Sequence, residues 1–194
     1  MKLNPWRRSG SAGFTLIEVA LALGIFALAI VSILGLLGPA VEQIEDIRLN
    51  QQANDVVSVL GADLQQYNAD GETSTSAFEE LFNLVSREAA VLYVFRDLQG
   101  DLEVTPNPGD VEDVDGRVFG ARLSVSGVNS RDYVQPSGDI FVINGFQADS
   151  YPEAFLALRV DLHVMPTPAP GTSFEPATPT ETNLLLRYHT AVNR

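Results

Sequence analysis

The sequence contains no cysteine, which excludes a disulfide framework, a thiolate zinc site and an iron–sulfur cluster. Basic residues are also few: 12 Lys and Arg stand against 25 Asp and Glu, a net charge of −13. The phosphates of a nucleic acid would repel such a surface, so we predict no nucleic-acid partner. With 194 residues, the chain is long enough for one globular domain with a real core and an additional segment.

Charge is nearly absent from residues 14–41, where Glu18 is the only charged residue. The stretch from position 19 to position 41 is free of charge and mostly apolar. An α-helix needs about 20 apolar residues to cross the hydrocarbon core of a bilayer, so this stretch is long enough to span a membrane. Residues 1–13, before it, are polar and basic, with Lys2, Arg7 and Arg8.

Three general interpretations of this segment compete. A secretory signal peptide has an apolar region of about 7–15 residues, which is shorter than this one, although Gly38-Pro39-Ala40 could mimic its cleavage site. Arg7-Arg8 matches a twin-arginine export signal but lacks the surrounding context of one. An ordinary single-pass anchor explains the length but not Glu18, because a carboxylate costs about 2.5–3.5 kcal/mol at mid-membrane and less near the surface.

The start of the apolar run reads Gly13-Phe14-Thr15-Leu16-Ile17-Glu18. Together with the basic leader, residues 1–13, and the long apolar segment, it resembles the cleavage and methylation motif of type IV prepilins and type II secretion pseudopilins. The resemblance covers the chain to about residue 65. It implies that prepilin peptidase cuts between Gly13 and Phe14 and N-methylates Phe14. It also implies that Glu18 pairs with the Phe14 ammonium group of a neighbouring subunit during assembly.

The same resemblance implies the partners of the chain: prepilin peptidase, other pilin or pseudopilin subunits, the inner-membrane assembly platform and membrane lipid. Basic residues precede the apolar segment, and acidic residues follow it. The positive-inside rule therefore places the leader in the cytoplasm and residues 42–194 outside the inner membrane, in the periplasm or in a cell-surface filament. Three of the 12 basic residues lie in the leader, so the cleaved chain has a net charge of −16 and no lysine.

The residues predict an α+β fold, in which a long N-terminal helix spans the membrane with its first half and packs on a small antiparallel sheet. The resemblance implies that this fold is pilin-like. The helix should reach about Tyr67, because apolar residues recur at steps of mostly three and four: Ile44, Ile47, Ala53, Val56, Leu60, Leu64 and Tyr67. Pro39 predicts a kink in it. A capping-box pattern at Ser76 and Glu79 predicts a short second helix.

β-Branched and aromatic residues between turn-forming clusters predict six strands, at residues 91–96, 102–105, 117–126, 139–144, 154–165 and 184–190. The last two alternate clearly between apolar and other residues. Proline is concentrated in residues 166–182, between those two strands, which predicts an extended and exposed loop at the tip of a hairpin. Aromatic residues at periodic positions are expected in the core: Phe78, Phe82, Tyr93 and Phe95.

One acidic loop is a weak calcium candidate through Asp110, Glu112, Asp113 and Asp115, because calcium takes clustered oxygen ligands. Val111 stands where an EF-hand loop has its first aspartate, which favours a solvated acidic turn. His163 and His189 lie on strands that could pair, but two histidines without a third ligand fall short of a zinc site. We expect structural, exposed or half-buried histidines, and no metal or other cofactor.

No Gly-x-Ser-x-Gly motif and no phosphate-binding loop with a lysine occurs, so we predict that the protein is not an enzyme. The expected function is that of a prepilin-like structural subunit, minor rather than major. The segment after Glu18 resembles minor pilin and pseudopilin helices and, more loosely, the Verru_Chthon cassette protein B group. The alternatives are a membrane-tethered binding domain that does not polymerise, which would have no use for Glu18, and a secreted enzyme with an unusual signal peptide.

Overall fold

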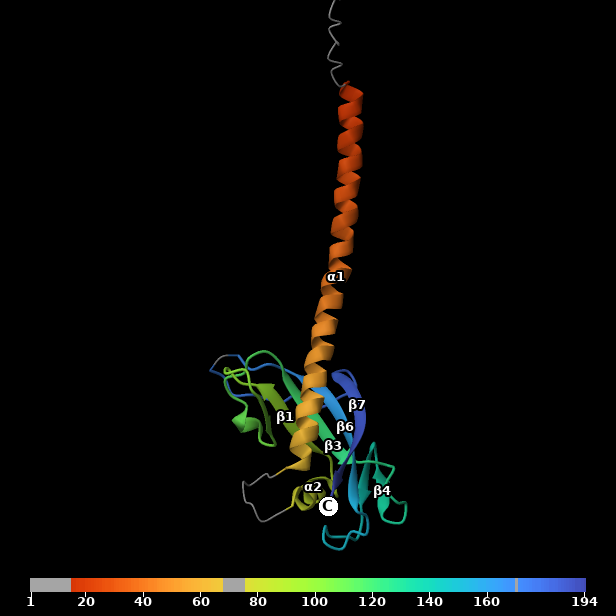
Figure 1. The fold of residues 1–194 in the computed structure, drawn as a ribbon, viewed down its shortest axis with the longest axis vertical. Coiled ribbons are helices and arrows are strands. Elements are labelled where there is room, and N and C mark those ends of the chain that lie inside the picture. The colour runs from red at the N-terminus through yellow and green to blue at the C-terminus, as the bar shows by residue number, and fades with distance from the viewer. Residues whose placement is uncertain (1–14, 68–75, 170) are drawn as a thin grey trace, which may run out of the picture. The chain divides into compact units, whose positions relative to one another are not determined.

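The computed structural model describes residues 15–67, 76–169 and 171–194, and for Glu42 the backbone alone. It divides into two units, residues 1–49 and residues 50–194. Helix α1, Leu16–Gln65, contributes to both units and is 50 residues long (Figure 1). The predicted end at about Tyr67 is confirmed to within two residues.

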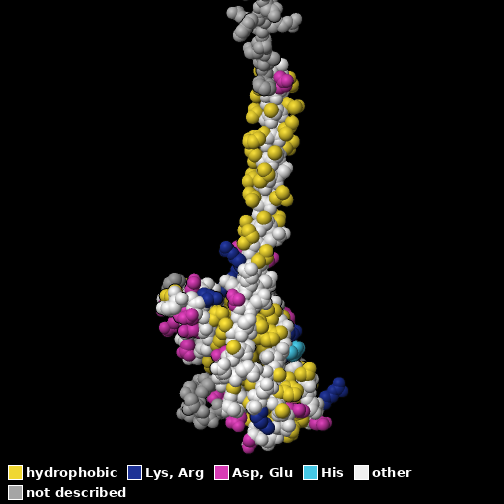
Figure 2. All heavy atoms as spheres, viewed as in Figure 1, with side chains coloured by type: hydrophobic (Ala, Val, Ile, Leu, Met, Phe, Trp, Pro, Cys, Tyr) yellow, Lys and Arg dark blue, Asp and Glu magenta, His cyan; other side chains and the backbone are white. Residues whose placement is uncertain are grey.

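In the N-terminal unit, every described side chain from Leu16 to Val41 is exposed. The most apolar window of α1 has a mean hydropathy of 2.7, and none of it is buried. Figure 2 shows hydrophobic side chains along the whole of this stretch, on the face in view. The chain therefore has, near its N-terminus, a helix long and apolar enough to cross a membrane. The helical backbone runs on through Pro39.

The second helix, α2, covers Ala77–Val85 and begins as the sequence predicts. The hydroxyl of Ser76 accepts a hydrogen bond from the backbone N–H of Glu79 at 3.3 Å, which satisfies one of the free donors of the first turn. The apolar positions of α2 face inward, and its buried side chains are Phe78, Leu81, Phe82 and Val85. Phe78 and Phe82 are thus core residues, as expected.

Seven strands form one antiparallel sheet in the described part of the chain: β1 Ala90–Arg96, β2 Leu102–Thr105, β3 Val118–Val125, β4 Val134–Ser137, β5 Ile140–Ile143, β6 Phe155–Met165 and β7 Leu184–Asn193. The strand order is β2-β1-β3-β5-β4, and β6 pairs with both β3 and β7. All six predicted strands are confirmed. The α+β layout of a long helix with a small antiparallel sheet is therefore correct (Figure 1).

Strand β4 was not predicted from the sequence. It contains Pro136 and has a single buried residue, Val134, so it lacks the alternation that marks a half-buried strand. It pairs only with β5, at one end of the sheet order, where a proline is tolerated because one side of the strand needs no hydrogen-bond donor.

One face of the sheet packs on the last turns of α1. Phe119 of β3 lines a small cavity with Val56 of α1, and the side chain of Gln65 donates a hydrogen bond to the carbonyl of Ala191 at 2.8 Å. The helix buries Ala53, Val56, Leu60 and Leu64, and the sheet buries Leu92, Val94, Ala121, Leu123, Leu158, Val160 and Leu162. These apolar side chains, removed from water on both elements, form the main core.

The apolar stripe predicted along the helix is buried only from Ala53 onward. Ile44 and Ile47 belong to the same stripe but are 52% and 57% exposed. Periodicity identifies one face of a helix and carries no information about where its partner surface begins. Here the packed turns belong to the second unit, which begins at Asn50.

A second apolar cluster covers part of the opposite face of the sheet. It contains Tyr93, Phe95, Val118 and Met165 from strands, together with Val111 and Phe174 from two loops. Phe174 is 7% exposed, and its ring lies 5.4 Å from that of Tyr93, edge to face. The loop at residues 166–182 does connect β6 to β7, as predicted, but it is anchored to the sheet rather than exposed along its whole length.

Asp63 is half-buried among the packed turns of α1, and this burial raises the pKa of its carboxyl above 3.8. Because the Asp63 carboxyl has a higher pKa in the folded chain than in the unfolded chain, its ionisation lowers the free energy of unfolding. This loss is complete at a pH above the folded-state pKa and disappears at a pH below the unfolded-state pKa. We therefore expect Asp63→Asn to raise the midpoint of thermal unfolding at about pH 7 and to leave it unchanged at about pH 3. Thermal scans at both pH values measure this; an equal gain at both would contradict the explanation by burial.

Candidate functional site

The residues with the strongest sequence signal lie at the beginning of α1. Gly13 and Phe14 are outside the described residues, whereas Thr15 and Glu18 are within them. The carboxylate of Glu18 accepts hydrogen bonds from the backbone N–H and from the hydroxyl of Thr15, both at 2.9 Å. The backbone N–H of Glu18 donates in return to the hydroxyl oxygen of Thr15 at 3.3 Å.

This reciprocal arrangement is a capping box, with Thr15 at the N-cap and Glu18 three residues later. It also places a carboxylate at the positive end of the helix dipole. A simple membrane tether was expected to gain nothing from Glu18. That expectation is wrong, because the Glu18 carboxylate stabilises the start of its own helix. Glu18 therefore has a use within one chain, and the pairing with a neighbouring Phe14 must be tested separately.

A row of ion pairs crosses the sheet face opposite α1. It joins six charged side chains. They are Arg122 in β3, Asp139 in the turn before β5, Arg159 and Asp161 in β6, Glu181 in the loop before β7, and Arg187 in β7. Asp161 is at its centre and is only 2% exposed. Its two carboxylate oxygens accept from Arg187 at 2.5 and 3.1 Å, and Arg159 lies 3.5 Å away.

The pKa values along this row follow from its geometry. Hydrogen bonds with Asp161, and then with Glu181, raise the pKa of the Arg187 guanidinium above its usual value. The hydrogen bond from Arg122 lowers the pKa of the Asp139 carboxyl, which is largely exposed. The Arg187 guanidinium and the Asp139 carboxyl are thus held in their charged forms. The row ties three strands together instead of forming a reactive pair.

The two histidines do not meet. His163 is opposite Leu184 in the register of β6 and β7, and His189 is opposite Arg159. His163 is 3% exposed, so the expectation of an exposed or half-buried side chain is wrong for it, while His189 is exposed. The Pro-rich loop covers this face, which strand alternation could not predict.

The role of His163 is to hold the end of that loop. Its Nδ1 lies 3.1 Å from the amide oxygen of Asn183, which also accepts from the backbone N–H and hydroxyl of Thr180. Because an amide oxygen only accepts hydrogen bonds, Nδ1 of His163 carries the proton. Sequence reasoning did not identify this contact, since Asn183 lies 20 residues from His163 and no motif joins them.

The acidic loop does not assemble a metal site. Asp110 accepts hydrogen bonds from the hydroxyl of Thr105 and the amide of Asn107, both at 3.0 Å. Val111, between the acidic residues, is buried in the second apolar cluster. Within residues 15–67, 76–169 and 171–194, no three His, Asp or Glu side chains lie close enough to hold one metal ion, so Asp110, Glu112, Asp113 and Asp115 are not brought together.

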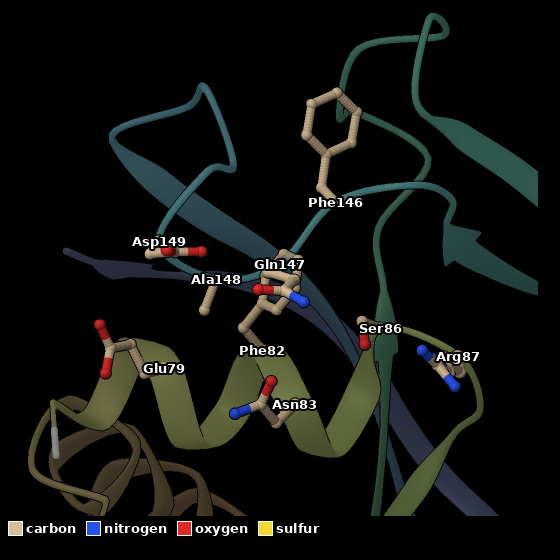
Figure 3. Close-up of a pocket in the computed structure, with 9 residues that line it drawn as sticks. All are labelled: Glu79, Phe82, Asn83, Ser86, Arg87, Phe146, Gln147, Ala148 and Asp149. Carbon is tan, nitrogen blue, oxygen red and sulfur yellow. The ribbon is translucent and has the colours of Figure 1, made fainter.

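An open cleft of about 520 Å³ lies between α2 and the segment from Phe146 to Asp149. Figure 3 shows Glu79 on α2, below Asp149 on the opposite side of the cleft, and Phe82 pointing from α2 toward Gln147. Its lining is mostly polar and includes no histidine, so it offers no serine–histidine pair for nucleophilic catalysis.

The C-terminal arginine was also missed by the sequence reasoning. The guanidinium of Arg194 donates to the carbonyl oxygens of Ala148 and Tyr151 and lies 4.8 Å from the ring centre of Phe78. This contact fastens the end of β7 to α2 and to the floor of the cleft. A lone arginine after a strand has no sequence signal that distinguishes this contact from an exposed charge.

Comparisons with known proteins add no assignment. The chain matches no protein-family model, no curated protein and no solved structure.

Proposed function

We propose that the protein is a prepilin-like structural subunit, cleaved between Gly13 and Phe14 by prepilin peptidase and N-methylated on Phe14. It assembles through its N-terminal helix into a type IV pilus or a type II secretion pseudopilus, as a minor subunit. The observation that carries the proposal is the sequence Gly13-Phe14-Thr15-Leu16-Ile17-Glu18 placed directly at the start of an exposed, membrane-length apolar helix.

The chemistry of each position supports the proposal. Gly13 lacks a Cβ, so the backbone before the cut can lie extended in a narrow protease cleft. Cleavage removes the basic leader and creates an ammonium group at Phe14, one helical turn from the carboxylate of Glu18. In the low dielectric of a membrane, these opposite charges on adjacent subunits attract strongly, whereas either one alone is costly.

Assembly through the helix also gives a use to its apolar surface. From Val19 to Val41 the side chains are uncharged, mostly apolar and exposed on all sides of the helix. Such a surface suits contact with lipid before assembly and with other helices after it. The remaining domain has its own core and its own sheet.

A processing assay tests the proposal. The full chain is produced in bacterial membranes with and without a prepilin peptidase, and its length is followed by immunoblot. We expect peptidase-dependent loss of residues 1–13 in the wild type. Gly13→Val should reduce this loss at least about tenfold, because the added side chain would clash with a narrow cleft that accepts a residue without a Cβ.

The matched control is Gly24→Val, which places the same side chain inside the apolar helix, where a Cβ meets no atom within 4 Å. This variant should be shortened as well as the wild type. Equal shortening of the Gly13 variant, or a wild-type chain whose length does not depend on the peptidase, would favour the non-polymerising membrane-tethered domain instead.

A further inference from the structure

A groove of about 410 Å³ lies between the acidic loop and the first part of the Pro-rich loop. Its apolar lining comes from three segments: Leu98 after β1, Val111 and Val114 in the acidic loop, and Pro168, Ala169 and Phe174 in the Pro-rich loop. We call it the two-loop groove. Its volume is within the range of sites that hold a small ligand or a few side chains of a partner.

Both walls of the two-loop groove are fixed. Val111 and Phe174 are buried in the second apolar cluster on the sheet. The hydroxyl of Thr167 donates to the carbonyl of Gly116 at 3.1 Å, which bridges the two loops directly. The backbone N–H of Asp115 donates to the carbonyl of Arg96 at 2.8 Å. The groove is therefore preformed, and a partner would not have to order it on binding.

The charges at the two-loop groove are of one sign. Glu112 and Asp113 line it, and no lysine or arginine does. Within the part of the chain that the structure describes, neither of these carboxylates forms an ion pair, although five ion pairs occur elsewhere in the sheet domain. Figure 2 shows Asp and Glu side chains gathered on the side of the domain that carries these loops.

Leu98 is unusual in this setting, because it is 65% exposed beside the acidic rim. An exposed leucine alone needs no explanation, but here it continues an apolar floor that already contains Val114 and Pro168. The site thus combines an unfilled apolar surface with carboxylates that have no partner cation. A bare metal ion would not suit it, since the apolar floor supplies no ligands.

We propose that the two-loop groove binds a protein segment in which arginine or lysine alternates with leucine, isoleucine or valine. The aliphatic side chains fill the floor formed by Leu98, Val114 and Pro168, and the cations face Glu112 and Asp113. Because the rim carries only negative charge, a basic segment binds better than a neutral or acidic segment with the same apolar side chains. The same attraction increases the rate at which the segment meets the acidic surface. The proposal uses only the geometry of the sheet domain and is independent of the proposed assembly function.

The test measures binding of fluorescein-labelled peptides to the full chain in nanodiscs of zwitterionic lipid, by fluorescence anisotropy. The probe is a five-residue peptide of alternating arginine and leucine. One control peptide replaces arginine by glutamate, and another replaces leucine by glycine. We expect saturable binding of the probe that weakens with salt, and at least about tenfold weaker binding of each control peptide.

Variants of the chain locate the site. Leu98→Arg should weaken binding of the probe at least about tenfold, because it blocks the floor and repels the cations. The double variant Glu112→Gln and Asp113→Asn should weaken it about five- to tenfold. Asparagine is chosen at Asp113 because the backbone there has φ 50°, a conformation that asparagine tolerates.

Val128→Arg is the matched control, since Val128 is 74% exposed and does not line the groove. It should leave binding unchanged, and the thermal unfolding of all variants should match that of the wild type. Three results would each overturn the proposal: no saturable binding of the probe, equal binding of the glycine-containing or glutamate-containing peptide, or equal weakening by Leu98→Arg and Val128→Arg.

Discussion

A chain with Glu18→Val is expected to insert into the membrane and to lose residues 1–13 normally, but to assemble with partner subunits at least about tenfold less than the wild type. Insertion survives because removing a charge from an apolar helix makes membrane insertion easier. Cleavage survives because the cut bond lies five residues before the change. Assembly fails because the Phe14 ammonium of a neighbour would then be buried without a partner, which costs about 3–5 kcal/mol.

Two further variants separate this pairing from the capping box. Glu18→Gln removes the charge but keeps an oxygen that can accept from the N–H of Thr15. Thr15→Val keeps the charge but removes the hydroxyl that accepts from the N–H of Glu18. If Glu18 pairs between subunits, the Gln variant should fail to assemble, and Thr15→Val should assemble with at most a small loss.

Crosslinking to partner subunits, compared at equal membrane abundance, measures assembly for all three variants. Methylation of Phe14 must be measured in the same samples, because a change there could alter assembly independently. If Glu18→Gln assembles as well as the wild type while Glu18→Val and Thr15→Val do not, then Glu18 acts only by capping its own helix. In that case the pairing between subunits is wrong.

Asp161→Asn is expected to lower the free energy of unfolding by about 3 kcal/mol, because it leaves two arginines facing a buried site without a negative charge. The value is at the low end of the usual range for a broken buried pair, since Arg187 is 41% exposed and can reach water. Urea unfolding of the full chain, followed by circular dichroism, measures this loss.

The matched control for that loss is Asp139→Asn, in the same row of ion pairs. Asp139 is 64% exposed and contacts Arg122 at 2.7 Å, so its removal should cost less than about 1 kcal/mol. If both variants lower the free energy of unfolding by a similar amount, the burial of Asp161 does not explain the loss.

Local sequence signals predicted most of the architecture correctly. The second helix was identified from Ser76 and its apolar spacing, and β6 and β7 from their alternation, because those features depend on neighbouring residues alone. The missing strand, β4, has too few apolar residues to alternate and is defined by pairing with β5. Its existence depends on tertiary structure that no local pattern contains.

The surroundings of individual side chains were harder to predict than the strands that carry them. Alternation placed Asp161 and His163 on the face away from Leu162, but it could not show that loops cover that face. Phe174, the residue that anchors the covering loop, stands in a proline-rich stretch that reads as solvent-exposed. The ion pair of Asp161 with Arg187 joins residues 26 positions apart, so it follows from the strand register.

The most direct test of the central claim is the mass of the mature N-terminal peptide, purified from membranes that contain prepilin peptidase. The account predicts a chain that begins at Phe14 and carries one methyl group on its α-amino nitrogen. A chain that begins near Ala40 or Val41 would identify a secretory signal peptide, and one that keeps residues 1–13 in the presence of active peptidase would identify a simple membrane anchor. Either result would contradict the assignment as a prepilin-like subunit.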